Sequence, residues 1–167
     1  MNPLEKFRYI KAFLFDVDGV LTDNKVLVLE EGKLLRQMSI RDGYAIKRAV
    51  RQGYRVCVIT GGKSEGVRKR LEDLGVQDIY LGQSDKRDAY EEFLATYDLK
   101  EDEILYLGDD LPDYPLLRRV GLPACPADAV PEVLEISQYV SPYAGGQGCA
   151  RDVIEKVLKL QGKWKVE

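Results

Sequence analysis

Short apolar runs of strand length recur along the chain, and segments with helical periodicity lie between them. A chain that alternates strands with helices folds through right-handed crossovers into a mainly parallel sheet. Functional groups then gather at the carboxyl ends of the strands. The sequence therefore predicts a doubly wound, Rossmann-like α/β fold. The expected strands cover residues 12–17, 56–60, 79–81, 104–107 and 122–125, and the expected helices cover residues 41–51, 64–74, 86–97 and 152–160.

One segment interrupts this alternation. Residues 25–29 and 34–38 are short β-prone runs separated by the sequence EEGK, which predicts a small β-hairpin over residues 25–38. An apolar two-stranded ribbon is marginal in water, so we expect it to pair with another subunit. No linker, low-complexity tract or repeat divides the chain, so residues 1–167 should form a single domain. The apolar residues of the expected hairpin include Val26, Val28, Leu34 and Met38.

The composition excludes several classes of protein. Lys and Arg number 25 and Asp and Glu number 28, and the resulting net charge of -3 lacks the basic excess of a nucleic-acid-binding protein. The first ten residues lack a signal-peptide core, and no apolar run approaches a membrane span, so we expect a cytoplasmic protein with no membrane partner. Cys57, Cys125 and Cys149 are too scattered for a disulfide framework or a zinc site. Because there is no histidine, the chemistry has to use carboxylates, lysine or a metal.

Acidic residues follow two of the expected strands. Asp16 and Asp18 come after the first apolar run, and Asp109, Asp110 and Asp113 come after the fourth. An acid in such a place is often only a turn or cap residue, but two clusters in one short chain favour a functional site. Converging carboxylates repel one another unless a cation neutralises them, and an all-oxygen ligand set suits a hard ion. The pattern therefore predicts a Mg²⁺ site.

A hydroxyl and a lysine follow two other strands. Thr60 ends the second apolar run, and Gly61 and Gly62 leave open backbone amides beside it, an arrangement that binds anions. Without a ligand, the same segment would be an ordinary helix start. Lys86 follows the third run, where an ammonium group could hold a phosphate, although a lysine at a helix start is usually solvated.

Taken in order, Asp16 with Asp18, Thr60, Lys86 and the cluster at Asp109 resemble the four motifs of the haloacid dehalogenase superfamily of phosphotransferases. The strings DVDGV and GDDLPD carry most of the specificity. The resemblance implies that Asp16 attacks a phosphate monoester, and that Asp18 protonates the leaving oxygen and later activates water. It also implies that Asp16, the backbone carbonyl of Asp18 and Asp109 hold the metal. Thr60 and Lys86 would hold phosphate oxygens, with Asp110 and Asp113 in support.

The intervals between these motifs are too short for the cap domain of larger members. Among capless members, the chain resembles the 3-deoxy-D-manno-octulosonate 8-phosphate phosphatases, through the strings RDGYA at residues 41–45, GDDLPD, and GGQG at residues 145–148 followed by Arg151. This resemblance implies a sugar acid phosphate as substrate. It also implies a homotetramer in which the hairpins meet and the C-terminal segment, residues 145–167, contacts a neighbouring subunit and helps to close its site.

The same resemblance implies a set of substrate contacts. Many relatives have arginine at the position of Gly62, and here Lys63 or Arg70 could replace that charge. Arg151 would bind the acidic substrate. Alternatively, as an arginine at the start of its helix, it would pair with a surface acid. The implied contacts are Asp18, Ser39, Ile40, Arg41, Asp42, Gly43, Lys47, Gly61, Gly62, Arg70, Lys86 and Arg151.

Three alternatives remain open on the sequence alone. The substrate could be a nine-carbon keto acid phosphate of the sialic acid type, since sister enzymes share this scaffold. The chain could also be a phospho-receiver domain, which combines acids, threonine and lysine on the same kind of sheet. A receiver has its acceptor Asp after a middle strand, before the threonine; the only acids of this type between Asp18 and Thr60 are Asp23 and Asp42, and neither follows a buried run. A catalytically silent regulatory subunit is a third alternative.

The glycines near Arg151 should be costly to order alone, so we expect that segment to settle only against a neighbour or a ligand.

Overall fold

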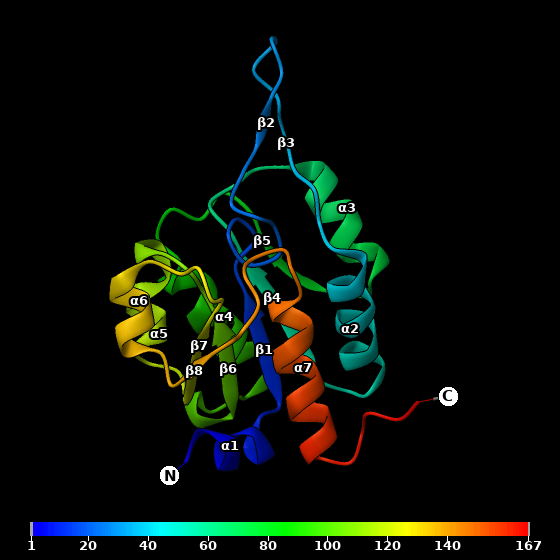
Figure 1. Ribbon diagram of the computed structural model, residues 1–167, viewed down its shortest axis with the longest axis vertical. Helices are drawn as coiled ribbons and strands as arrows, with labels where there is room; N and C mark the ends of the chain where they lie inside the picture. Colours follow the sequence, from blue (N-terminus) through cyan, green and yellow to red (C-terminus); the bar gives the residue numbers. More distant parts are fainter. Residues whose placement is uncertain (1, 167) are drawn as a thin grey trace.

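A six-stranded parallel sheet forms the centre of the protein in the computed structural model, which describes residues 2–166 (Figure 1). Its strand order is β5-β4-β1-β6-β7-β8, and each neighbouring pair is parallel. The doubly wound fold predicted from the sequence is confirmed. The strands are β1 (Ala12–Phe15), β4 (Arg55–Ile59), β5 (Asp78–Tyr80), β6 (Ile104–Leu107), β7 (Leu122–Cys125) and β8 (Tyr139–Val140).

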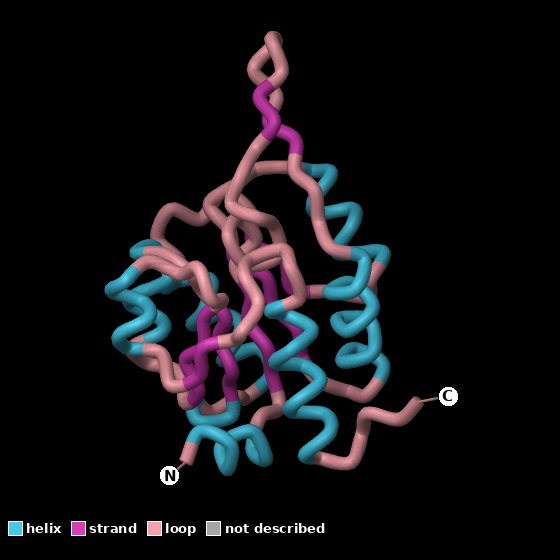
Figure 2. The backbone as a smooth tube through the Cα atoms, viewed as in Figure 1, coloured by secondary structure: helices cyan, strands magenta, loops and turns pink. Residues whose placement is uncertain are grey.

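Helices cover both faces of this sheet (Figure 2). Phe13 and Phe15 of β1 pack into the core beneath α2 (Ile40–Arg51), α3 (Glu65–Asp73) and α7 (Cys149–Leu160). Ala12 and Leu14 point to the other core, with α4 (Arg87–Tyr97), α5 (Tyr114–Leu117) and α6 (Pro131–Ile136). A strand covered on both faces is apolar throughout, which is why β1 is a continuous apolar run. Among residues 2–166, no helix is long and apolar enough to span a membrane.

The short elements α1 (Pro3–Lys6), α5, α6 and β8 were not predicted from the sequence. They contain two to six residues each, and they have no periodicity long enough to detect. The three cysteines are buried and unpaired, as expected for packing residues.

The hairpin projects away from the body of the molecule (Figures 1 and 2). Only β2 (Leu27–Val28) and β3 (Leu34–Leu35) pair as antiparallel strands, so the ribbon is shorter than predicted. Met38 does not belong to it, because its side chain packs against the main core. The exposed apolar residues of the ribbon are Val26, Leu27, Val28, Leu34 and Leu35.

The glycine-rich segment before α7 is positioned by its own chain. The Gly146 N–H donates to the Val20 carbonyl over 2.9 Å, and the Gly145 N–H donates to the Asp128 carboxylate over 3.0 Å. A Cβ atom at Gly145 would lie 2.0 Å from the Gly19 carbonyl oxygen, so only glycine permits this approach. The segment therefore has partners within its own chain, and its predicted contact with a neighbouring subunit stays a prediction.

Asp42 joins the starts of two packed helices. Asp42 lies in α2 and is buried, and one of its carboxylate oxygens accepts the Arg151 N–H at the start of α7 over 3.0 Å. Gly148, the residue before α7, has no side chain to cap the helix, and Asp42 supplies this cap from a distance. Asp42 therefore has a structural role within the chain, and the substrate contact predicted for it stays a prediction.

We expect the replacement Asp42→Asn to stabilise the protein at alkaline pH. Burial raises the pKa of Asp42 to about 6 from 3.8. Protonated Asp42 therefore adds to the free energy of unfolding below pH 3.8, and this stabilisation is lost as the pH rises through 6. The change in pKa from 3.8 to about 6 corresponds to roughly 3 kcal/mol in the free energy of unfolding. Asn keeps an acceptor oxygen without the charge. Thermal unfolding should show a higher Tm than wild type at pH 8 and no gain at pH 4.

Asp85→Asn is the control for this experiment. Asp85 is exposed, and its pairing with Arg87 lowers its pKa to about 2, so its replacement should bring no gain at pH 8. An Asp42→Asn variant with the same change in Tm at both pH values would contradict the assignment.

Candidate active site

Three carboxylates meet at the carboxyl edge of the sheet. Asp16 follows β1, while Asp109 and Asp113 follow β6, which pairs with β1. One oxygen from each of them lies within 4.8 Å of the others, and all three residues are buried. Gly19 makes this possible, because a Cβ atom there would lie 1.8 Å from Asp109 Oδ2. The predicted convergence of the two acidic clusters is therefore present in the structure.

A buried lysine holds the cluster together. Lys86, at the start of α4, is 3% exposed, and its Nζ lies 3.1 Å from Asp16 Oδ1 and 2.7 Å from Asp113 Oδ1. Tyr106 donates its hydroxyl to Asp113 over 2.7 Å, and the Asp109 N–H donates to the other oxygen over 3.0 Å. Asp113 thus has partners on both oxygens, and its role is to orient Lys86 beside Asp16.

The protonation of these groups follows from burial and from their neighbours. Burial, and next the charge of Asp113, raise the pKa of Asp16 well above its usual range. The same two causes raise the pKa of Asp109 to about 7. Burial alone would lower the pKa of Lys86, but the charges of Asp113 and Asp16 outweigh it and raise that pKa. The cluster therefore has an excess of negative charge that one lysine does not balance.

The donor set fits a hard divalent cation. Asp109 Oδ1 is buried and has no hydrogen-bond partner within residues 2–166. Likewise, no N–H of this described part of the chain donates to the Asp18 backbone carbonyl. Asp113, in contrast, is already saturated by donors. Asp16, the Asp18 carbonyl and Asp109 are therefore the groups with oxygens left to hold Mg²⁺, and their assignment as metal ligands stays a prediction.

The loop after β4 borders the same edge. Thr60 is buried, and its hydroxyl oxygen accepts the Gly62 N–H over 3.2 Å. The position of a Cβ atom at Gly61 has no neighbour closer than 3.8 Å, so the backbone there is open to a ligand. Asp110 is exposed and caps the adjacent Leu111 N–H over 2.7 Å, which is a supporting role.

Asp18 has a different environment from Asp16. Its side chain is 35% exposed, and both of its oxygens accept hydrogen bonds from Arg36, over 2.7 Å and 3.1 Å. Arg36 was missed in the sequence analysis. The only signal was a cation within the second β-prone run of the hairpin, and nothing local to that run indicates that it folds back to the first motif.

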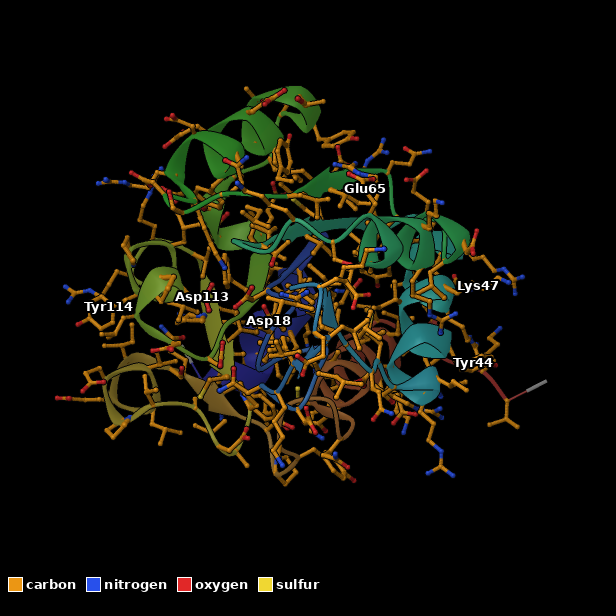
Figure 3. The ribbon with its side chains drawn as sticks, turned by 90° about the horizontal axis from the view of Figure 1, so that it is seen from above. Asp18, Tyr44, Lys47, Glu65, Asp113 and Tyr114 are labelled. Carbon is orange, nitrogen blue, oxygen red and sulfur yellow. The ribbon has the colours of Figure 1, made fainter. Side chains whose placement is uncertain are left out.

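Several residues implied as substrate contacts lie apart from this cluster within the single chain. Lys47 projects from the outer side of α2, whereas Asp18 and Asp113 lie over the strand ends (Figure 3). Ile40 and Arg41 are exposed at the start of the same helix. Ser39 caps α2 by accepting the Asp42 N–H over 3.2 Å. These contacts stay predictions.

Arg70 and Arg151 have partners of their own. A Cβ atom at Gly43 would lie 2.5 Å from Arg70 Nη2, so the Arg70 guanidinium rests on the glycine of α2. Arg151 pairs with Glu155 over 3.0 Å, and its guanidinium lies 5.5 Å from the ring centre of Trp164. Within the chain, Arg151 therefore follows the alternative in which it pairs with a nearby acid.

Comparison with known proteins gives one consistent result. A model of haloacid dehalogenase-like hydrolases matches residues 75–151. The 3-deoxy-D-manno-octulosonate 8-phosphate phosphatase KdsC of Escherichia coli strain K12 is 37% identical over 97% of this chain and 86% of its own length. The crystal structure of the same enzyme from Yersinia pestis has a TM-score of 0.94 at 36% identity, covering 97% of this chain and 88% of that one.

A third relative was solved with ligands. The phosphatase from Moraxella catarrhalis, in complex with magnesium ion, phosphate ion and a KDO molecule, has a TM-score of 0.92 at 31% identity, covering 96% of this chain and 92% of that one. The buried acidic cluster described above is thus found in a chain that resembles a magnesium-binding phosphatase over nearly its whole length.

We expect Mg²⁺ to stabilise the protein through Asp109. A ligand at one hundred times its Kd adds about 2.7 kcal/mol to the free energy of unfolding, so saturating Mg²⁺ should raise the Tm of the wild type by several degrees. Asp109→Asn should raise the Tm of the metal-free protein, because it removes one of the repelling charges, and it should abolish the Mg²⁺ response. The matched control is Asp110→Asn, which should keep that response. A Mg²⁺ shift that survives in Asp109→Asn would place the metal elsewhere.

Proposed function

Because the chain belongs to the haloacid dehalogenase-like hydrolases, in the group of the 3-deoxy-D-manno-octulosonate 8-phosphate phosphatases, we propose that it hydrolyses this sugar acid phosphate through an aspartyl-phosphate on Asp16. The observation that carries the proposal is the buried ion pair of Asp16 and Lys86 beside the open oxygen of Asp109, in a chain 36–37% identical to these phosphatases over 97% of its length. Magnesium is the cofactor.

The first step forms the covalent intermediate. An oxygen of Asp16 attacks phosphorus, the bond between phosphorus and the sugar oxygen breaks, and Asp18 gives its proton to that oxygen. The carboxylate of Asp16 is oriented for this attack, because its Oδ1 accepts the Val17 N–H over 2.7 Å and lies 3.1 Å from Lys86 Nζ. Thr60, with the open backbone at Gly61, would hold the phosphate oxygens.

The second step releases phosphate. Asp18, now ionised, takes a proton from water, the water oxygen attacks phosphorus, and the bond to Asp16 breaks. Inorganic phosphate leaves and both carboxylates return to their starting states. Held by Asp16, the Asp18 carbonyl and Asp109, Mg²⁺ supplies positive charge that offsets the charge of the phosphoryl group. Lys86 adds to this effect, and Asp113 keeps it in position.

The hairpin supports a proposal about assembly. Leu27 and Val28 are 63% and 64% exposed, on a ribbon that projects away from the body of the molecule (Figure 1). An exposed strand edge is a template for pairing with another chain, and a large exposed apolar patch marks an interaction site. We infer that the protein is a homotetramer in which the hairpins pack together.

The proposed function predicts a specific substrate preference. In a phosphate-release assay with Mg²⁺, 3-deoxy-D-manno-octulosonate 8-phosphate should be hydrolysed with a kcat/KM at least tenfold above that of a nine-carbon keto acid 9-phosphate. Chelation with EDTA should stop turnover of both. Asp16→Asn should lower kcat by at least 10³-fold, because an amide is a far weaker nucleophile than a carboxylate. A preference for the nine-carbon ester would overturn the substrate assignment, while full activity of Asp16→Asn would overturn the mechanism.

The assembly proposal predicts that a charge in the hairpin dissociates the protein. Sedimentation at micromolar concentration should give a tetramer for the wild type and smaller species for Leu35→Glu, with an unchanged circular dichroism spectrum. Leu4→Glu is the matched control, because Leu4 is 50% exposed and Leu35 is 46% exposed, but Leu4 lies in α1, at the opposite end of the molecule from the hairpin (Figure 1). The hairpin is not the interface if both variants remain tetrameric or if the wild type is a monomer.

A further inference from the structure

Arg36 brings a cation from the hairpin to the edge of the active site. It lies just after β3, where the returning strand of the hairpin reaches the body of the protein. Its side chain is only 8% exposed, and both of its hydrogen bonds go to Asp18. An arginine whose side chain is nearly buried requires a specific partner, because an unpaired buried charge is costly.

The loop after β4 leaves space for this guanidinium. A Cβ atom at Gly62 would lie 3.0 Å from Arg36 Nη2 and 3.5 Å from Arg36 Cζ. The hydroxyl of Thr60 lies 3.6 Å from the same point. The guanidinium therefore rests directly on Gly62 of the predicted anion-binding loop. A side chain at position 62 would press against it.

A cavity lined in part by Arg36 lies next to this loop. It has a volume of about 420 Å³ and lies between the hairpin and α3. Its lining residues include Arg36, Arg70 and Ser64 together with apolar residues, and none of them is acidic. Two arginines without an acidic residue among the lining favour an anion over a cation.

Arg36 has hydrogen-bonding capacity left for such an anion. A guanidinium has five N–H donors, and Asp18 uses two of them. No other acceptor within residues 2–166 is bonded to its side chain. The pairing with Asp18 also places the group on the side of the leaving oxygen, since Asp18 is the residue that gives a proton to that oxygen. The sugar, rather than the transferred phosphate, therefore faces Arg36.

We propose that Arg36, resting on Gly62, is the residue that binds the carboxylate of the sugar acid substrate and thereby determines specificity. This inference rests on the proposed function, because it requires a substrate with a carboxylate in addition to its phosphate. In the proposed mechanism the phosphate has its own ligands in Lys86, Thr60 and the metal, whereas Arg36 is the cation bonded to Asp18.

The test compares two esters and two products. Steady-state kinetics of wild type, Arg36→Gln and Arg36→Lys should be measured with the octulosonate phosphate and with p-nitrophenyl phosphate, which has no carboxylate. Inhibition constants should be measured for the free sugar acid and for inorganic phosphate. Arg68→Gln is the matched control, because Arg68 is an arginine of α3 that pairs on the surface with Glu65.

We expect Arg36→Gln to lower kcat/KM for the sugar acid phosphate by roughly 10- to 100-fold, the loss typical of a charge-assisted hydrogen bond. Most of the loss should be in KM, and the loss for p-nitrophenyl phosphate should be at least fivefold smaller. The free sugar acid should inhibit more weakly, with the inhibition by phosphate unchanged. Arg36→Lys should fall between wild type and Gln, since it keeps the charge but not the two-pronged geometry. Arg68→Gln should resemble wild type.

A second variant tests the same contact without removing the charge. Gly62→Ala places a methyl group against the guanidinium, so it should cause a smaller loss with the same preference for the sugar acid phosphate. Equal losses for both esters in Arg36→Gln, or weaker inhibition by inorganic phosphate, would overturn the inference. A wild-type enzyme that does not hydrolyse the octulosonate phosphate at all would instead overturn the proposed function.

Discussion

The pairing of one buried ammonium group with buried carboxylates is the interaction on which the site depends. Asp16, Asp109 and Asp113 approach within 4.8 Å of one another at the end of two neighbouring strands, and Lys86 bonds to two of them. Carboxylates this close repel strongly in a poorly hydrated place, so Lys86 and a bound cation are both needed to keep them ionised. Gly19 and Gly108 permit the approach, since a Cβ atom at either one would overlap an aspartate side chain.

The two acids that follow β1 differ because their neighbours differ. Asp16 lies inside the cluster and is oriented by Lys86 and by the backbone of the next residue. Asp18 lies nearer to solvent and bonds to Arg36 of the hairpin. A nucleophile that must not move and an acid that must reach the leaving group require such different settings. The hairpin therefore contributes to the site through Arg36, while its exposed apolar half is free for assembly.

The chain has no cap domain, so short segments from distant parts of the sequence border the site. The glycine-rich segment before α7 is bonded to Val20 and packs on Gly19, next to the first motif. Asp42 then caps α7 from the start of α2 and fixes the position of both helices. These contacts connect the C-terminal third of the protein to the loop that contains Asp16 and Asp18, and they stabilise that loop without covering it.

The sequence by itself determined the parallel α/β fold, the convergence of Asp16 and Asp109, and the placement of Lys86 beside them. Each of these follows from local patterns, because acids and lysines that end parallel strands necessarily meet at one edge of the sheet. Asp113 was named only as support, and its pairing with Lys86 and Tyr106 became visible in the structure. The tertiary structure alone decided that Arg36 reaches Asp18, that Asp42 caps α7 and that Arg151 pairs with Glu155. For Arg36 and Asp42, the partners lie 18 and 109 residues apart in the chain, so no local periodicity records them. Arg151 and Glu155 are neighbours on one helix turn, but the packing of α2 and Trp164 around the guanidinium determines where it points.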